Sequence, residues 1–276
     1  MKVLIVGLGL MGGAYAYKLK NKGYTVYGSD INSKVIEYAK KNNFIDDGDI
    51  KPDKFIKDSD LIILAFYPKL ILEFLKKYNH LFNENQVITD ICGVKSSFVF
   101  KATKLSIPAS YISHHPMAGR EKVGIEYSKE CVFDGANYLI INIKDTNKNK
   151  NYVIENMALD LGFGNISYVT DKEHDKLVGY TSQLTHAIAV SLVNSDKDKN
   201  TKNFIGDSYR DLTRIAKINE NLWSELFLEN KKALIKHIDN FELELNLLKR
   251  ALENDDKELL KEIFRKSTKK RKEMDK

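Results

Sequence analysis

The chain is poor in cysteine, with only Cys92 and Cys131 among 276 residues. Two cysteines cannot build a disulfide framework, and no CxxC pair or Cys/His cluster is present to hold zinc. The longest apolar run, residues 61–67, has the length of a strand, whereas a membrane-spanning helix needs about 18 apolar residues. The N-terminus also lacks the apolar segment of a secretory signal. These absences predict a cytoplasmic protein with no membrane span and no metal site.

Excess charge is also scarce outside the C-terminus. The net charge is +6, and residues 261–276 hold eight Lys or Arg against three Asp or Glu. The rest of the chain is therefore nearly neutral. A basic run such as residues 269–272 is more often the solvent-exposed end of a helix than a nucleic-acid-binding segment. We therefore predict no nucleic-acid partner.

What the sequence does contain is an alternation of strand and helix patterns up to about residue 170. Hydrophobic residues make up 43% of the chain, which is enough for a packed core. The alternation predicts parallel strands joined by helical crossovers, hence a doubly wound α/β sheet. Its expected strands are 3–6, 25–27, 61–66, 87–89 and 111–113. Two more, 138–143 and 166–169, are expected to extend the sheet at its edge.

Beyond Thr170 the strand patterns stop. Thr170 and Glu173 form a capping-box sequence, which opens a helix over 171–194 whose apolar face starts at Leu177 and Thr181. A second series of apolar residues at helical spacing predicts one long helix from about 218 to 252. We therefore divide the chain into an α/β domain, residues 1–170, and an all-helical domain, residues 171–276.

The apolar stripe of the long predicted helix is longer than one flanking helix can cover. An uncovered stripe of that size marks an interface. Two-fold pairing is the commonest closed solution. The sequence therefore predicts a homodimer, with Phe241, Leu245 and Leu248 at or near its axis.

A GxGxxG turn follows the first strand and opens a helix. Its glycines permit a tight turn and let a pyrophosphate approach the amides at the helix N-terminus. Asp30 ends the second strand, where a carboxylate binds ribose hydroxyls and repels a 2′-phosphate. We predict NAD rather than NADP as the cofactor. The predicted cofactor-binding residues are Gly7, Gly9, Leu10, Met11, Gly12 and Asp30.

A histidine follows a later strand, in the sequence Ser113-His114-His115-Pro116. Side chains in this position lie at the carboxyl edge of a parallel sheet, where ligands bind. Oxidation of an alcohol or enol requires a group that accepts the hydroxyl proton or hydrogen bond as hydride leaves, and a histidine suits this task. We therefore predict His115 as the catalytic base.

Four further segments, together with the glycine turn, resemble the prephenate dehydrogenase family. The string SHHPMAGREKVG at 113–124 is similar to the family's GHPMAG signature, and TDICGVK at 89–95 to its Thr-Asp-x-Gly-Ser-x-Lys segment. SQLTH at 182–186 resembles Ser-His-Leu-Pro-His. YRDLTRIA at 209–216 resembles Phe-Arg-Asp-Phe-Thr-Arg-Ile-Ala, with Trp223 at the expected distance.

The resemblance implies an N-terminal NAD domain, a helical substrate and dimerisation domain, and an active site between them. The implied reaction is NAD-dependent oxidative decarboxylation of prephenate to 4-hydroxyphenylpyruvate for tyrosine synthesis. His115 then takes the hydrogen bond of the ring hydroxyl, and Arg214 suits a substrate carboxylate because its guanidinium can bind both oxygens. The implied substrate-site residues are Ser182, His186, Arg214, Glu121 and Trp223.

The chain departs from the family pattern at three positions. Gly93 stands where the family often has a serine that supports the histidine, Gln183 replaces a histidine, and His114 replaces a glycine. Arogenate remains an alternative substrate. A dehydrogenase of small hydroxy acids and a non-catalytic dinucleotide sensor are broader alternatives. The sensor has no need of the base His115 and the carboxylate-binding Arg214.

Overall fold

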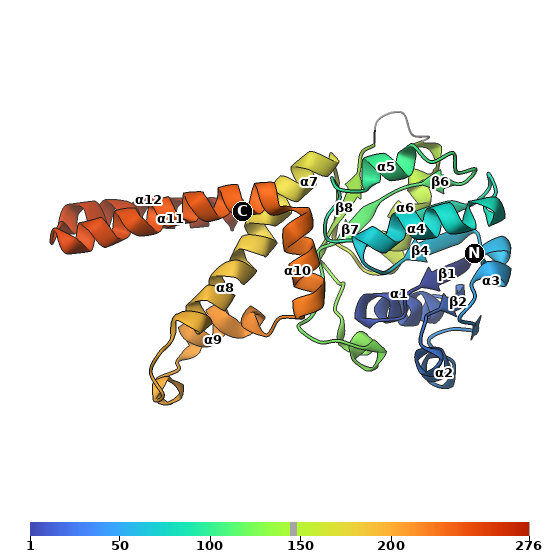
Figure 1. Ribbon diagram of the computed structural model, residues 1–276, viewed down its shortest axis with the longest axis horizontal. Helices are drawn as coiled ribbons and strands as arrows, with labels where there is room; N and C mark the ends of the chain where they lie inside the picture. Colours follow the sequence, from blue (N-terminus) through green and yellow to red (C-terminus); the bar gives the residue numbers. More distant parts are fainter. Residues whose placement is uncertain (144–147, 276) are drawn as a thin grey trace. The chain divides into compact units, whose positions relative to one another are not determined.

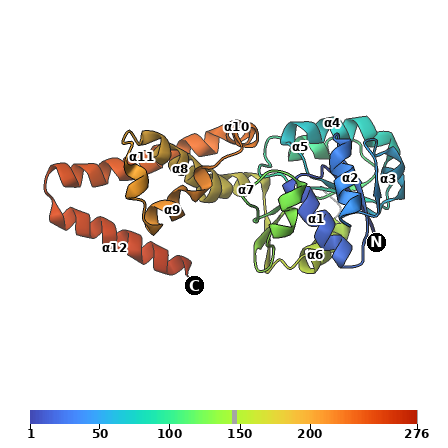
Figure 2. The same cartoon turned by 90° about the horizontal axis from the view of Figure 1, so that it is seen from below.

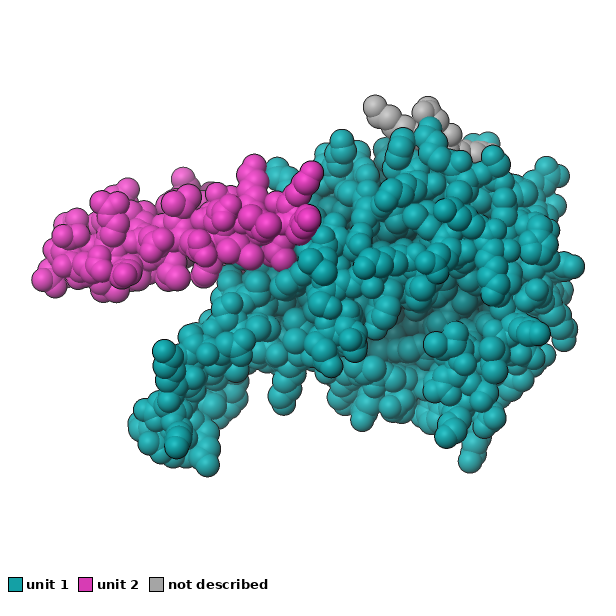
Figure 3. Space-filling view, in the orientation of Figure 1, with its two compact units in different colours: residues 1–230 teal, residues 231–276 magenta. Residues whose placement is uncertain are grey.

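The computed structural model describes residues 1–143 and 148–275. The chain forms two compact units, residues 1–230 and residues 231–276, which Figure 3 shows in teal and magenta. None of the helices in the described ranges is both long and apolar enough to cross a membrane.

A six-stranded parallel sheet forms the centre of the first unit (Figure 1). Its strands are β1 (Lys2–Val6), β2 (Thr25–Ser29), β3 (Asp47–Gly48), β4 (Leu61–Leu64), β5 (Val87–Asp90) and β6 (Ser110–Tyr111). The spatial order is β3-β2-β1-β4-β5-β6, and every neighbouring pair is parallel. The predicted doubly wound sheet is confirmed. Its order reverses between β1 and β4, which is where such sheets bind ligands.

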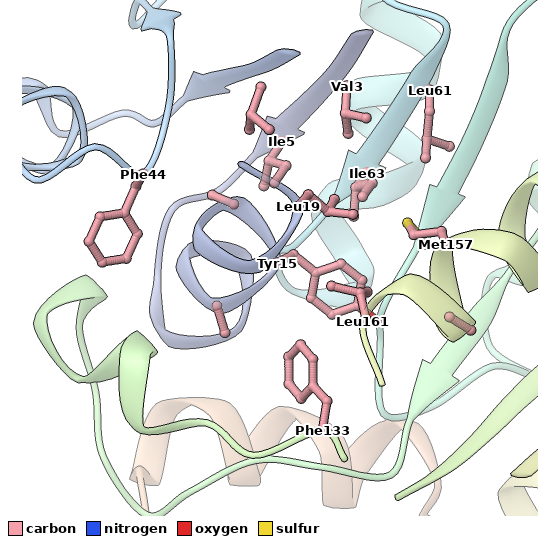
Figure 4. Packing of buried hydrophobic residues seen from close by; sticks show 14 of the residues in the cluster. Val3, Ile5, Tyr15, Leu19, Phe44, Leu61, Ile63, Phe133, Met157 and Leu161 are labelled. Carbon is pink, nitrogen blue, oxygen red and sulfur yellow. The ribbon is translucent and has the colours of Figure 1, made fainter. Parts of the chain in front are cut away.

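Helices cover both faces of this sheet. In β1, Val3 and Ile5 belong to one buried cluster, whereas Leu4 and Val6 belong to the other. The first face carries α1 (Leu10–Asn21), α2 (Ser33–Lys41) and α6 (Asn151–Asp160), and the second carries α3 (Asp53–Asp58), α4 (Pro68–Tyr78) and α5 (Val99–Thr103). Figure 4 shows Tyr15 of α1 beside Phe133, with ring centroids 5.4 Å apart. This two-sided burial explains why β4 and residues 3–6 of β1 are continuously apolar.

The last strands of the α/β part form a second sheet, which corrects the expectation that they extend the first. β7 (His114–Pro116) pairs antiparallel with β8 (Asn137–Ile141), and β8 pairs parallel with β9 (Asn165–Val169). The cause lies at Ser113, whose carbonyl accepts a hydrogen bond from the amide of Ile141. β8 therefore pairs with the segment that follows β6 rather than with β6 itself.

Helices complete the first unit from Asp171 onward. They are α7 (Asp171–Val178), a π-helical stretch (Gly179–Gln183), α8 (Leu184–Ser195), α9 (Asp207–Thr213) and α10 (Glu220–Glu229). The predicted capping box of Thr170 and Glu173 is confirmed. The predicted apolar face is wrong at its start, because Leu177 and Thr181 are exposed while His174, Asp175 and Val178 are buried. The π-helical stretch adds residues to a turn and so changes which positions face inward.

The long helix predicted over 218–252 is wrong, because it breaks at Asn230 into α10 and α11 (Lys231–Glu253). Asn230 donates from Nδ2 to the carbonyl of Asp175 and to Oε1 of Gln183, and these tertiary bonds hold the break. In the second unit, a turn at Asp255 joins α11 to α12 (Lys257–Met274), as Figure 2 shows. An ion pair between Glu244 and Lys266 links the two helices.

The boundary proposed near residue 170 marks the end of the strands, whereas the compact units divide after Asn230. Helix α7 is tied to the α/β part because Asp175 accepts hydrogen bonds from the amides of Lys95 and Ser96. Helix α10 is tied to α7 because Asn230, at its end, donates to the carbonyl of Asp175. The division into domains 1–170 and 171–276 therefore stays a prediction.

Candidate functional site

The glycine turn lies between β1 and α1, at the carboxyl edge of the sheet. Gly7 has φ +92°, a backbone conformation that favours glycine. A Cβ on Gly12 would lie 1.9 Å from the carbonyl oxygen of Gly7, so only glycine lets the helix approach the turn. A Cβ on Gly9 would meet no atom within 4 Å. The turn is therefore tight on its inner side and open at Gly9, just before Leu10 and Met11 begin α1.

Asp30 follows β2 and reaches back to this turn. Its Oδ2 accepts a hydrogen bond of 2.8 Å from the amide of Leu8, and its Oδ1 accepts one of 2.9 Å from the amide of Asn32. The side chain is partly exposed. A helix N-terminus, an open glycine and a nearby carboxylate are what a dinucleotide's pyrophosphate and ribose hydroxyls require, so these residues fit NAD.

His115 lies on β7 and is held by a buried pair on α7. Its Nδ1 is 2.8 Å from Nε2 of His174, and Nδ1 of His174 is 2.8 Å from Oδ1 of Asp175. Burial, with His174, Lys95 and His114 nearby, lowers the pKa of His115 well below 6.5. His115 is therefore neutral at neutral pH, as a base must be.

The other ring nitrogen of His115 faces Gly93. A Cβ on Gly93 would lie 3.8 Å from Nε2 of His115 and 3.6 Å from a methyl carbon of Leu226. Nε2 and Leu226 thus face the same space beside Gly93, and no side chain at this position caps Nε2.

The proposed substrate residues form two groups. The rings of His186 and Trp223 stack, with centroids 3.7 Å apart and planes 27° apart. His186 donates from Nδ1 to the backbone carbonyl of Ser182 over 2.9 Å. Arg214 and Glu121 form an ion pair whose arginine side chain is 64% exposed. Burial lowers the pKa of His186, although the Ser182 carbonyl and Glu121 act in the opposite direction.

Helix α10 connects these contacts to His115. Leu226 approaches the Gly93 side, and Trp223, three residues earlier, stacks on His186. Residues three apart lie on neighbouring positions of a helix surface. Gln183 donates from Nε2 to the carbonyl of Leu226 over 3.2 Å and so holds α10 against the π-helical stretch.

A buried polar cluster supports the strand that carries His115. Lys95 has no exposed side-chain surface, and it donates from Nζ to Asp90 and to the backbone carbonyl of His114, each over 2.6 Å. The ring of His114 contacts Thr89 and Tyr15 at 2.6 and 3.1 Å. The residue next to His115 is thus held on both its backbone and its side chain.

Sequence reasoning missed His174, Asp175 and Leu226. His174 and Asp175 directly follow the capping box. In the sequence they are only two adjacent polar residues, and an exposed helix turn would show the same pattern. Among residues 1–143 and 148–275, no group of three or more His, Cys, Asp or Glu is arranged to hold a metal ion.

Sequence comparisons identify related proteins over nearly the whole chain. Residues 15–163 match the family model of the prephenate dehydrogenase nucleotide-binding domain, and residues 170–266 match that of its dimerization domain. A prephenate dehydrogenase of Bacillus subtilis is 30% identical over 278 residues, which cover 95% of this chain and 73% of the relative. A cyclohexadienyl dehydrogenase of Zymomonas mobilis is 27% identical, with 98% and 94% covered.

Solved structures agree. The prephenate dehydrogenase of Aquifex aeolicus, crystallised with hydroxyphenyl propionate and NAD+, is 31% identical, with a TM-score of 0.89 over 99% of this chain and 98% of that one. The arogenate dehydrogenase of Synechocystis is 23% identical with a TM-score of 0.82, over 99% of this chain and 100% of that one. The second comparison shows a shared fold.

Proposed function

The chain belongs to the prephenate dehydrogenase family, and from this premise we propose that it catalyses the NAD-dependent oxidative decarboxylation of prephenate to 4-hydroxyphenylpyruvate in tyrosine biosynthesis. The observation that carries the proposal is the placement of His115. It lies on β7 with Nε2 toward Gly93, and Leu226 of α10 approaches the same open position above that glycine.

His115 is the proposed catalytic residue. Because His115 is neutral, its Nε2 accepts the proton of the substrate's ring hydroxyl. Hydride leaves the carbon that bears this hydroxyl. NAD, when bound, supplies the hydride acceptor. The residues that hold it are Gly7, Gly9, Leu10, Met11, Gly12 and Asp30.

Decarboxylation completes the reaction on the substrate. The bond between the ring and its carboxylate breaks, its electron pair makes the ring aromatic, and the oxygen regains a proton from His115. The products are carbon dioxide and 4-hydroxyphenylpyruvate, with no proton left on the enzyme.

Arg214 and His186 are the proposed contacts for the dianionic substrate. A guanidinium binds both oxygens of a carboxylate, which a lysine ammonium cannot do in the same geometry. Arg214 already pairs with Glu121 through Nη1, so a substrate carboxylate would compete with Glu121 for that nitrogen. Trp223 and the Ser182 carbonyl fix the ring of His186 in this region.

We also propose a homodimer in the cytoplasm, without a nucleic-acid partner. The match of residues 170–266 to a dimerization domain supports pairing, and so do Phe241 and Leu245 of α11, which are 37% and 53% exposed. Both cysteines are free and buried, as suits a reducing compartment. Light scattering after size exclusion tests the dimer, and a mass near 31.6 kDa at micromolar concentration would contradict it.

The experiment that tests the activity is a comparison of NADH formation from prephenate and from arogenate under identical conditions. We expect prephenate to give the higher kcat/KM, with 4-hydroxyphenylpyruvate as the product. A preference for arogenate would move the assignment to that substrate. No NADH from either, in a protein that binds NADH, would support a sensor instead.

A further inference from the structure

A buried chain of hydrogen bonds runs from His115 through His174 to Asp175. The two links are both 2.8 Å long. His174 has no exposed surface and Asp175 is 4% exposed. Neither side chain is therefore placed to bind substrate, and the bond from His174 to Nδ1 of His115 is their direct link to the proposed base.

The proton positions in this chain follow from Asp175. Its Oδ1 accepts a hydrogen bond of 2.8 Å from the amide of Lys95, and its Oδ2 accepts one of 2.7 Å from the amide of Ser96. Burial acts against its charged form, but the bonds from His174 and Ser96 outweigh burial and lower the pKa of Asp175. Asp175 is thus a carboxylate, which only accepts hydrogen bonds.

His174 must then carry a proton on Nδ1, the atom that faces Asp175. Burial lowers the pKa of His174 despite this carboxylate, so the ring is neutral and its Nε2 is an acceptor. The partner of that acceptor is Nδ1 of His115. His115 must therefore donate from Nδ1, which leaves the lone pair on Nε2.

We propose that His174 and Asp175 are positioning residues that hold His115 in the tautomer with its proton on Nδ1 and a free Nε2. This inference rests on the proposed function, because it explains how the base of that reaction is kept in its reactive form. The tautomer of a histidine is set by the hydrogen bond that its other nitrogen makes. Here that bond comes from the side of the ring opposite Gly93.

The chain also acts when His115 takes the hydroxyl proton. A new N–H bond forms at Nε2 and the ring becomes positively charged. Nδ1 then donates more strongly to His174, and the carboxylate of Asp175 stabilises the charge through the shared hydrogen bonds. His115 thereby receives from α7 the orientation that a side chain at Gly93 does not provide.

Nitrogen NMR tests the tautomer directly, without substrate or cofactor. Long-range proton–nitrogen correlations in enzyme labelled at its histidine rings distinguish the two neutral tautomers, and His115→Asn and His174→Gln identify the two signals. At neutral pH we expect both rings to be neutral with the proton on Nδ1. A proton on Nε2 of His115 would overturn the proposal.

Kinetics of Asp175→Asn test the consequence. Asparagine carries no charge, so it cannot stabilise the positive ring of His115 through His174, and its NH2 group cannot accept from the amide of Lys95 or Ser96 as a carboxylate oxygen does. We expect kcat for prephenate to fall roughly 10²–10⁴-fold, with KM changed less than about threefold. The matched control is Asp171→Asn in the first turn of the same helix, which should keep wild-type kcat.

His174→Gln provides a second, independent variant. Glutamine still offers an acceptor to His115 but cuts the link to Asp175, so kcat should fall while KM stays near the wild-type value. The charged and titratable groups that face His115 are His174, Lys95 and His114, and each lowers its pKa. Removing His174 should therefore move the acidic limb of the kcat/KM profile to higher pH.

The outcomes separate the two proposals. Wild-type enzyme that turns over neither prephenate nor arogenate refutes the proposed function, and the NMR result still decides the tautomer. Active wild type together with folded Asp175→Asn and His174→Gln variants of unchanged kcat and pH profile refutes the positioning role. If Asp175→Asn does not fold, His174→Gln and the NMR of the wild type decide.

Discussion

The imidazole of His186 lies flat on the indole of Trp223, with 3.7 Å between ring centroids. This stack fixes the ring plane, and the Ser182 carbonyl fixes its rotation through Nδ1. The free nitrogen of His186 is thereby aimed without any contact from the substrate. Because the ring of His186 is already oriented before substrate binds, less side-chain conformational entropy is lost on binding.

Trp223→Ala should therefore weaken substrate binding. An aromatic contact of this kind contributes about 0.5–1.5 kcal/mol beyond its buried area, so we expect KM for prephenate to rise about 3–10-fold with a smaller change in kcat. Trp223→Phe should retain part of the effect. Asn221→Ala, on the exposed side of α10, is the control. Unchanged KM in Trp223→Ala would show that the stack serves packing alone.

Arg214→Lys should raise KM for prephenate more than it lowers kcat, because the bidentate contact is lost while the charge remains. Glu121→Gln should do the opposite and lower KM, since the competing carboxylate of the ion pair is removed. The pair is exposed, so the second effect should be within about 1 kcal/mol and should shrink at high salt. Steady-state kinetics at two salt concentrations measure both. A higher KM in Glu121→Gln would refute the competition.

Much of the fold is predictable from the sequence, for reasons that particular residues illustrate. Val3 to Val6 are buried on both faces, and a short run of such residues before a glycine turn is typical of a central parallel strand. The pairing of β7 with β8 is not predictable in this way. β7 contains His114, His115 and Pro116, which carry no strand pattern, and its partner is fixed by tertiary bonds such as Ser113 with Ile141.

The same distinction holds at the site. His115 could be found because it follows a strand and precedes a proline. Its support could not, because His174 is 59 residues away in sequence and meets His115 only through the fold. The break at Asn230 is similar. No glycine or proline marks it, and the hydrogen bonds to Asp175 and Gln183 that hold it are tertiary.

Asp30 should exclude NADP, because its carboxylate would stand against the 2′-phosphate. A like-charge contact of this kind costs several kcal/mol, so the ratio of kcat/KM for NAD over NADP should exceed about ten. Asp30→Asn removes the charge and keeps an acceptor for the Leu8 amide, whereas Asp30→Ala removes both. Both variants should lower the ratio of kcat/KM for NAD over NADP. Asp30→Ala should weaken NAD binding more than Asp30→Asn does. Wild-type preference for NADP would contradict this role.

Acid should destabilise the protein through three histidines whose pKa is lowered in the folded state. Burial lowers the pKa of His114, His115 and His174 in the folded state. The unfolded chain, with histidine pKa values of about 6.5, binds more protons below that pH. Stability is therefore fully present above about pH 6.5 and falls below it, by about 1.4 kcal/mol per pH unit for each such histidine until its folded-state pKa is reached.

Urea unfolding at a series of pH values measures this dependence. His174→Gln should reduce the slope of the free energy of unfolding against pH, because one of the three neutral rings is removed. A free energy of unfolding that stays constant as the pH falls from neutral to about 5 would show that these histidines are protonated in the folded protein as readily as in the unfolded chain.

The most direct test of the account is steady-state turnover of prephenate and NAD by His115→Asn beside the wild type. Asparagine retains a hydrogen-bonding side chain but cannot accept the hydroxyl proton. We predict that kcat falls roughly 10²–10⁴-fold while KM for prephenate stays near the wild-type value. A kcat close to that of the wild type, or a loss confined to KM, would contradict the assignment of His115 as the base.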